Sequence, residues 1–465
     1  MSYYWANLKI LLPLGVEKHN GETMRTVKVC DALCGAGKTT ACINLINSSD
    51  QRFIFITPYL AEVERIVKCC ADKKFVTPSS RVYDGYTKLD DIHELLKQGR
   101  NIASTHALFA NYTDETKELI RSQRYILILD EVIDLFKPVG IDKGDIEMLL
   151  RNNVAFKSGD GIVWGDEEYT GVTFNEIMQM SKSKNLIDLG GSLFFWIVPM
   201  DVFGCFAEIY ILTYLFEHQP LKSFFDIYGF KYELIGTKRI GNSYQLCSIT
   251  EMDRAIDLRN KIHILDNEKL NEIGKDYYAL SSRWFDKSLK ESGQPNIERL
   301  KHNLANLFRH IFAGETNQRM WASVTQYRKC IRGKGYSNGF ISFNRRATNE
   351  FSHKKYLAYC VNVFLQPWMT NYLKKLGAAE MNQDMYALSV LVQWIFRSAI
   401  RNGEEVWIYL PSRRMRKILE QWLENLVRGD DLKPITAPRN EFMRFKSRKA
   451  IREFLRQGDE QGEKK

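Results

Sequence analysis

The sequence lacks a hydrophobic run long enough to cross a membrane. Its longest apolar stretch, residues 190–206, is interrupted by Pro199 and Asp201, whereas a spanning helix needs about 20 consecutive apolar residues. The N-terminal stretch has no basic segment ahead of its apolar run, which Pro13 interrupts, so no export signal is predicted. These absences argue against a membrane partner and indicate a cytoplasmic protein.

The sequence also lacks Cys-x-x-Cys motifs. The chain has nine cysteines, and they are scattered without the Cys-x-x-Cys pairs that are typical of zinc sites. Cys30, Cys34 and Cys42 lie close together, yet no histidine follows them at the spacing of a zinc finger. Free thiols in a reducing compartment are therefore expected.

Negative charge is in deficit. The 465 residues carry 66 Lys and Arg against 56 Asp and Glu, a formal net charge of +10. Much of this excess lies in residues 411–465, where Phe442 and Phe445 alternate with basic residues. A basic surface favours a polyanionic partner, and basic residues interleaved with aromatic ones suit a nucleic-acid strand. A solvated basic helix face is the alternative.

Apolar segments of strand length alternate with helical patterns in two blocks. The expected strands lie at residues 26–30, 53–56, 101–104, 125–129, 208–216, 320–324, 339–343 and 406–410. This alternation predicts an α/β fold with parallel sheets.

The length is typical of roughly two to four domains. We expect two α/β lobes, at residues 1–235 and 236–425, and a basic helical C-terminal extension at residues 426–465. Alternating residues with glycines predict a small β insertion in the first lobe, at about residues 151–200.

A glycine-rich turn separates the first expected strand from a helix that is expected to begin at about Thr39. Residues 31–40 read DALCGAGKTT, which matches the phosphate-loop pattern G-x-x-x-x-G-K-[ST] except for Ala32 at the first glycine. Lys38 suits the β- and γ-phosphates of ATP, and the Thr39 hydroxyl suits Mg²⁺. The expected ATP-binding residues are Gly35, Ala36, Gly37, Lys38, Thr39 and Thr40. A glycine-rich turn with a solvated lysine is the alternative.

Two adjacent acids follow the apolar strand at residues 125–129. In parallel sheets, ligands bind at the carboxyl ends of the strands. Asp130 is therefore expected to hold Mg²⁺, and Glu131 to orient or deprotonate an attacking water. Acids at a solvated turn are the alternative, but a phosphate loop earlier in the chain favours a hydrolase.

A third pattern lies near the C-terminus. From Ser389 to residues 402–403 the sequence predicts one helix. Gln393, Arg397 and Arg401 then form a polar stripe on one face, because they are four residues apart. A stripe that carries two arginines and no acidic residue suits the charge that develops on a γ-phosphate, with Arg401 favoured as the finger. A solvent-facing stripe is the alternative.

The order of these segments resembles that of the superfamily 2 helicases. The segments read GAGKTT, ITPY at residues 56–59, STH at 104–106, DEVI at 130–133, RATNE at 346–350 and QWIFRSAIR at 393–401. They are similar to those of the DEAD/DEAH-type helicases carried by phages and plasmids. The resemblance covers about residues 25–425 and implies two RecA-like lobes that hydrolyse ATP with Mg²⁺.

The same resemblance implies a nucleic-acid strand lying across the ends of both sheets, with single-stranded DNA as the expected partner. The residues that it places at the strand are Thr57, Tyr59, Thr105, His106, Thr348 and Asn349. Such contacts reach the backbone and position the strand without reading its sequence.

The function expected from these features is an ATP-dependent helicase or translocase, catalysed by Glu131, Arg397, Arg401 and Gln393. It would act in the replication or repair of a phage or mobile element, with replication proteins as candidate partners. One alternative is a DNA-packaging ATPase, whose nuclease lobe needs clustered acids for two metals. The other is a scaffold that binds nucleotide and nucleic acid without turnover.

Overall fold

The structure is a computed structural model that describes residues 26–81, 85–171, 173–182, 185–189, 194–253, 256–312, 314–344, 350–430 and 432–437. The chain forms two compact units. Unit 1 comprises residues 1–253 and 365–381, and unit 2 comprises residues 254–364 and 382–465.

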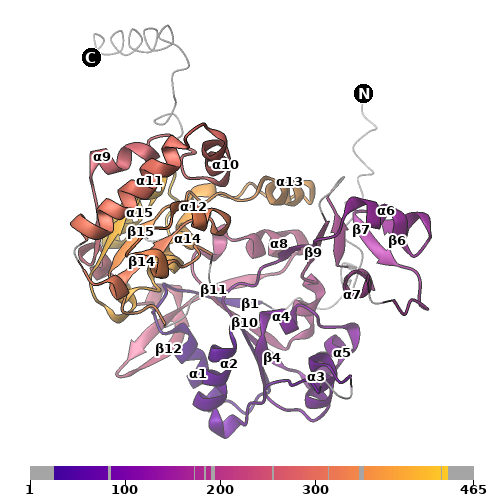
Figure 1. Cartoon of the computed structure of the whole chain (residues 1–465). Coiled ribbons are helices and arrows are strands. Elements are labelled where there is room, and N and C mark those ends of the chain that lie inside the picture. Colours follow the sequence, from indigo (N-terminus) through magenta and orange to yellow (C-terminus); the bar gives the residue numbers. More distant parts are fainter. Residues whose placement is uncertain are drawn as a thin grey trace, which may run out of the picture. The chain divides into compact units, whose positions relative to one another are not determined.

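The core of unit 1 is a seven-stranded sheet (Figure 1). Its strands, in spatial order, are β12 (Ser243–Ser248), β11 (Tyr232–Ile240), β1 (Val27–Asp31), β10 (Glu208–Thr213), β4 (Ile126–Asp130), β2 (Phe53–Thr57) and β3 (Ile102–Thr105). All neighbouring strands run parallel except the β11–β12 hairpin. The apolar residues of β4 and β2 are buried, as expected for strands covered on both faces. The parallel sheet predicted for the first lobe is confirmed.

Helices connect these strands. They are α1 (Lys38–Ser48), α2 (Leu60–Cys69), α3 (Lys88–Lys97), α4 (His106–Phe109), α5 (Asp114–Gln123) and α8 (Pro220–Tyr228). The expected lobe boundary at residue 235 falls inside β11. The reason is that β11 pairs with β1 on one side and with β12 on the other, so the sheet of unit 1 continues to Ser248.

A five-stranded antiparallel sheet is inserted between β4 and β10. Its order is β5 (Phe136–Pro138), β9 (Phe194–Ile197), β8 (Leu186–Asp188), β7 (Gly161–Trp164) and β6 (Ala155–Ser158), with helices α6 (Lys143–Arg151) and α7 (Asn175–Lys182). The predicted β insertion therefore exists. It begins before residue 151, because β5 pairs with β9, the last strand of the insertion.

Helix α13 (Pro367–Lys375) belongs to unit 1, although the sequence analysis placed it in the second lobe. Its Tyr372 and Leu373 are buried in the same apolar core as the sheet of unit 1. Trp368 stacks on Phe195 of β9, with 3.9 Å between the ring centroids. Lys375 donates to both carboxylate oxygens of Asp160 at 2.6 Å. Aromatic packing thus holds this segment on the inserted sheet.

Unit 2 contains a four-stranded sheet in which every neighbouring pair is parallel. Its order is β13 (Ile262–Ile264), β16 (Val406–Tyr409), β15 (Tyr356–Tyr359) and β14 (Arg319–Ala322). Its helices are α9 (Glu268–Asn271), α10 (Ser282–Lys290), α11 (Pro295–Asn306), α12 (Arg328–Ile331), α14 (Gln383–Ile395) and α15 (Arg413–Arg428). The second α/β block is confirmed.

One strand predicted for this block is wrong. Residues 339–343 make a single bridge, between Phe340 and Trp321, and are otherwise not a strand. The position beside β14 is taken by β15, whose Tyr356 pairs with Arg319. Gly339 lies against the Arg319 carbonyl, which a Cβ would approach to 2.5 Å. Residues 339–343 therefore pack closely against the backbone of β14 without forming a continuous strand pair with it.

Candidate nucleotide site

The loop between β1 and α1 has the backbone that a phosphate-binding turn requires. Gly35 and Gly37 have φ angles of 83° and 76°, a region that glycine adopts without strain. No described side chain caps the start of α1. Its first backbone N–H groups can therefore receive an anion, which the helix dipole also favours.

The side chains of Lys38 and Thr39 lie at this turn. The Lys38 ammonium donates to the carbonyl oxygens of Ala32 and Leu33, at 2.5 and 3.0 Å. The Thr39 hydroxyl donates to Oδ1 of Asp130 at 3.4 Å. The two expected metal ligands, from β4 and α1, are therefore neighbours. A hydroxyl and a carboxylate are hard oxygen ligands, and this set fits Mg²⁺, which keeps its other positions for phosphates and water.

The Asp130 carboxyl lies in an unfavourable place for its own charge. Burial, with Glu131 and Glu62 nearby, raises its pKa to about 7. A half-buried acid with two acidic neighbours is more easily kept ionised when a cation lies beside it. Because Mg²⁺ binds the ionised carboxylate, we expect metal affinity to increase as the pH rises through this value.

Replacing Asp130 by asparagine should stabilise the protein without nucleotide at high pH. The folded pKa of about 7 exceeds the unfolded value of about 3.9. The folded state therefore binds an extra proton between these values, and stability falls as the pH rises through that window. Thermal unfolding should show that the stability of the mutant, relative to that of the native chain, increases between about pH 4 and about pH 8. A pH-independent difference would contradict the raised pKa.

Glu131 has an unusual backbone. Its φ angle is 64°, a left-handed conformation that costs a residue other than glycine about 1–3 kcal/mol. Its N–H donates to the Leu212 carbonyl of β10 at 3.0 Å. The strand thus turns sharply just after Asp130, and strain of this kind persists only where the surroundings hold it.

The β11–β12 hairpin contacts the turn between β1 and α1, which the sequence did not predict. The Thr237 hydroxyl donates to the Ala36 carbonyl at 2.6 Å, and the Asn44 amide of α1 donates to the Tyr244 carbonyl at 2.8 Å. The Tyr244 ring lies against Gly37, where a Cβ would approach it to 2.2 Å. The Gly241–Asn242 turn was the available signal for the hairpin. Its contact with the loop depends on tertiary structure.

The residues predicted to contact nucleic acid in unit 1 differ in exposure. The Thr57 side chain is fully buried at the end of β2. Tyr59 and Thr105, which precede α2 and α4, are half-buried. His106 is buried, and its Nε2 lies 3.0 Å from the carbonyl oxygen of Asp130. Its side chain therefore points toward the acid pair. Thr348 and Asn349 lie outside the described residues.

The helix predicted over residues 389–402 is wrong. Helix α14 ends at Ile395, and a separate 3-10 turn covers Ala399–Asn402. The Ala399 N–H donates to the Lys354 carbonyl at 2.8 Å, and the Ser398 hydroxyl donates to the Ile395 carbonyl at 2.6 Å. Both bonds compete with continued helix.

Gln393, Arg397 and Arg401 consequently do not form one stripe. Gln393 is half-buried on α14. Arg397 is only 2% exposed and donates to the Ser342 carbonyl at 3.4 Å. Arg401 is half-buried in the 3-10 turn, which leaves it the more accessible of the two arginines.

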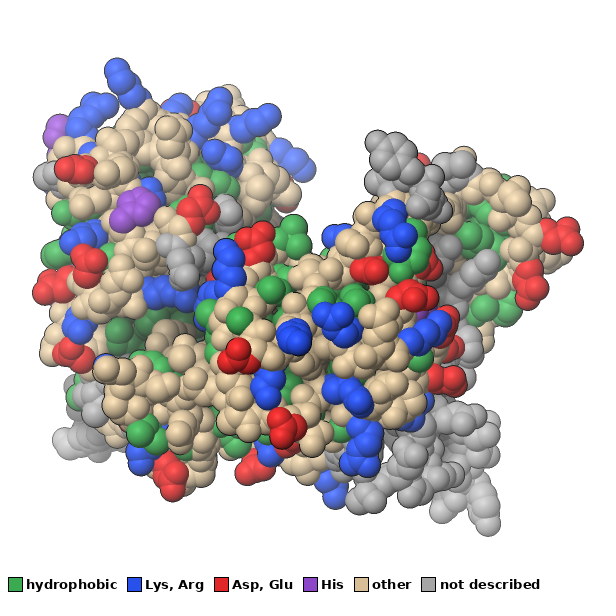
Figure 2. Space-filling view, turned by 90° about the horizontal axis from the view of Figure 1, so that it is seen from below, with side chains coloured by type: hydrophobic (Ala, Val, Ile, Leu, Met, Phe, Trp, Pro, Cys, Tyr) green, Lys and Arg blue, Asp and Glu red, His purple; other side chains and the backbone are tan. Residues whose placement is uncertain are grey.

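The basic C-terminal extension is described only in part. Helix α15 continues to Arg428, and Ile435 is buried while the Ala437 N–H donates to Asp384 at 2.6 Å. Residues 438–465 lie outside the described residues. Over the described residues as a whole, the face in Figure 2 shows Lys and Arg side chains interspersed with Asp and Glu side chains.

Three further findings concern the described residues only. None of their helices has the length and apolar character needed to cross a membrane. Among them there is also no group of three or more His, Cys, Asp or Glu residues that could hold a metal by themselves. All nine cysteines are free, as expected.

The two parallel sheets define an α/β protein, and residues 256–423 match the family described as the YonV C-terminal Rossmann-like domain. Residues 136–196, which contain the inserted sheet, match the YonV middle domain. The chain is 42% identical to the SPbeta prophage-derived uncharacterized protein YonV of Bacillus subtilis (strain 168), over 86% of this chain and 100% of that protein. The chain belongs to the YonV family.

The solved structures that the chain matches, at low TM-scores, include helicases. The apo form of XPD has a TM-score of 0.46 and 11% identity, over 85% of this chain and 95% of that one. Xpd4 of S. tokodaii has a TM-score of 0.43 and 12% identity, over 85% and 94%. The DUF1998 helicase MrfA, solved with DNA and AMPPNP, has a TM-score of 0.32 and 10% identity, over 86% and 48%.

Proposed function

We propose that the chain is an ATP-dependent nucleic-acid helicase or translocase with two RecA-like lobes. The observation that carries this proposal is the contact between Thr39 and Asp130, at 3.4 Å. It places the loop between β1 and α1, which can bind phosphates, next to Asp130 and Glu131, which can bind a metal and a water. These are the parts that nucleoside triphosphate hydrolysis requires.

Each part of the site then has a role. The N–H groups at the start of α1 and the Lys38 ammonium bind the β- and γ-phosphates. Thr39 and Asp130 hold Mg²⁺, which when bound neutralises charge on the phosphates. The Glu131 carboxylate orients the attacking water and accepts its proton. Arg397 and Arg401, with Gln393, are the proposed contribution of unit 2.

A nucleic-acid partner is supported by the positions of Tyr59 and Thr105. Tyr59 follows β2 and Thr105 is the last residue of β3, so both lie at the carboxyl edge of the sheet that also carries Asp130. The net charge of +10 favours a polyanion. We propose single-stranded DNA as this partner, in the replication or repair of a phage or mobile element, since the YonV relative is prophage-derived by name.

Strand binding should depend steeply on salt. For a strand held through its phosphates, log affinity should fall linearly with log salt, at about −0.7 per phosphate neutralised. Anisotropy of labelled single-stranded DNA, duplex DNA and RNA would measure this. Deleting residues 438–465 tests the tail, because the cut leaves the buried Ile435 and the Ala437 contact in place. Absence of salt-sensitive affinity for any of these ligands would contradict a nucleic-acid partner.

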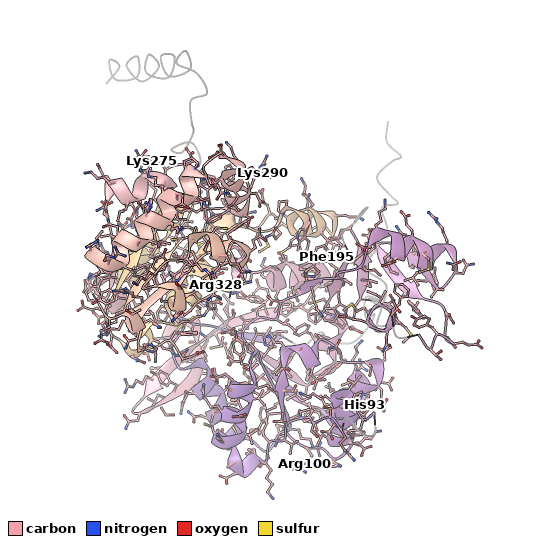
Figure 3. All side chains as sticks on the ribbon, viewed as in Figure 1. His93, Arg100, Phe195, Lys275, Lys290 and Arg328 are labelled. Carbon is pink, nitrogen blue, oxygen red and sulfur yellow. The ribbon has the colours of Figure 1, made fainter. Side chains whose placement is uncertain are left out.

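Replacing Arg401 by lysine should reduce strand-stimulated hydrolysis by about 10³-fold, as for other arginine fingers. Lysine keeps the charge but loses the planar fork that grips two oxygens, so ATP affinity should be nearly unchanged. Arg328→Lys is the matched control, because Arg328 is an exposed arginine of unit 2 that lies over the Phe340 ring (Figure 3). Normal turnover in Arg401→Lys would remove Arg401 from the proposed site.

A further inference from the structure

The peptide bond between Asp130 and Glu131 is held at both ends. Its carbonyl oxygen lies 3.0 Å from Nε2 of His106. Because a carbonyl can only accept a hydrogen bond, Nε2 is the donor. At the other end of the peptide, the Glu131 N–H donates to the Leu212 carbonyl of β10 at 3.0 Å. Two bonds on opposite sides of one planar unit fix the orientation of that plane.

This peptide needs such support. Glu131 is held in a left-handed conformation, with φ at 64°, and a residue other than glycine stays there only when its surroundings oppose relaxation. The direction of the Glu131 side chain follows from this backbone conformation. His106 therefore acts on the proposed general base through the main chain.

His106 also lies beside a candidate strand-binding position. It is the first residue of α4 and directly follows Thr105, the last residue of β3. In the sheet order, β2 separates β3 from β4. The imidazole thus reaches past the end of β2, where Thr57 pairs with Thr105 in register. A displacement at the end of β3 reaches the acid pair through one side chain.

We propose that His106 is a positioning residue that couples strand binding at the end of β3 to the geometry of Glu131. This inference rests on the proposed function for its catalytic part. A strand seated at Thr105 sets the position of His106. His106 in turn sets the Asp130–Glu131 peptide, so hydrolysis becomes fast only when the strand is present.

The test compares His106→Ala with His106→Gln, whose side-chain amide keeps a donor of similar reach. His106→Ala should lower the oligodeoxythymidine-stimulated kcat for ATP by about 10²-fold, a typical cost of misplacing a reacting group. The KM for ATP and the affinity for the oligonucleotide should stay within about twofold, because the imidazole is buried and bonded to the Asp130 carbonyl. His106→Gln should restore most of the stimulation.

His93→Ala is the matched control. This histidine of α3 also makes a polar contact within unit 1, with Nε2 2.7 Å from the Thr116 hydroxyl of α5 (Figure 3). Its loss should leave stimulation unchanged. Full stimulation in His106→Ala would overturn the proposal. So would an equal loss of every parameter that His106→Gln does not rescue, because that result identifies a purely structural residue.

Hydrogen exchange provides a readout that needs no hydrolysis. In His106→Ala, the amide of Glu131 should exchange faster than in the native chain, and in His93→Ala it should not. Equal exchange in all three proteins would show that His106 does not hold the Asp130–Glu131 peptide, even if the chain hydrolyses ATP. A native chain without ATPase activity would refute the proposed function, whereas the exchange result would still decide whether His106 holds the peptide.

Discussion

Replacing Lys38 by alanine is expected to abolish ATP hydrolysis and to weaken ATP binding. The change removes the cation nearest the turn between β1 and α1. Loss of one preorganised charge-stabilising group costs roughly 10²–10³ in kcat, and loss of binding adds to this. Turnover and nucleotide titration, each with Mg²⁺, would measure the two effects.

The control for Lys38→Ala is Lys28→Ala. Lys28 lies on β1, the strand that precedes the turn, and pairs with Glu208 at 2.5 Å, so its loss removes a lysine without touching the turn. Thermal unfolding of both variants shows whether the turn has collapsed, because Lys38 also bonds the carbonyls of Ala32 and Leu33. Native turnover in Lys38→Ala would refute the phosphate-loop assignment.

Replacing Glu131 by glutamine is expected to preserve ATP binding and to reduce turnover by roughly 10²–10⁴, the typical contribution of a general base. Glutamine keeps the shape of the side chain but cannot accept the proton of the attacking water. Single-turnover hydrolysis together with a nucleotide affinity would separate the two steps. The variant should also remain on its strand longer, since ATP is bound but not consumed.

Glu176→Gln is a suitable control for this change. Glu176 lies in the inserted domain, where it pairs with Lys137 at 3.5 Å across an exposed surface, and a surface pair of this kind contributes little. If Glu131→Gln lost nucleotide affinity together with turnover, Glu131 would be a structural acid at the turn after β4.

The candidate site in unit 1 could largely be predicted from local sequence. The apolar runs before Asp31 and Asp130 predicted β1 and β4, and the glycine-rich turn predicted the start of α1. Parallel strands place their carboxyl ends at one edge, so Thr39 and Asp130 were expected to meet. The two side chains do lie in contact, while their roles as metal ligands stay predictions.

The misses share a physical cause. The helical period around residues 383–402 is real, but the Ser398 hydroxyl and the Lys354 carbonyl end the helix at Ile395. One of these hydrogen bonds is local and the other comes from a segment distant in sequence, and neither can be predicted from the spacing of apolar residues. Helix α13 was assigned to the wrong unit for a similar reason. The sequence shows that this helix has an apolar face, but it does not show that the face packs against Phe195.

His106 shows how a motif residue can have an unexpected contact. Its place in the STH segment suggested a nucleic-acid contact, and the structure places its imidazole against the Asp130 carbonyl. The positive φ of Glu131 could not be read from the sequence either, because glutamate carries no preference for that conformation. Both features depend on three strands that are distant in sequence.

The central claim is that Thr39, Asp130 and Glu131 form an ATP-hydrolysing site driven by a nucleic-acid strand. The most direct measurement is the ATPase rate of the intact chain with Mg²⁺, alone and with single-stranded DNA, duplex DNA or RNA. The account predicts slow hydrolysis alone and strong stimulation by single-stranded DNA, both lost in Lys38→Ala. No hydrolysis under any of these conditions, or a rate indifferent to every nucleic acid, would contradict it.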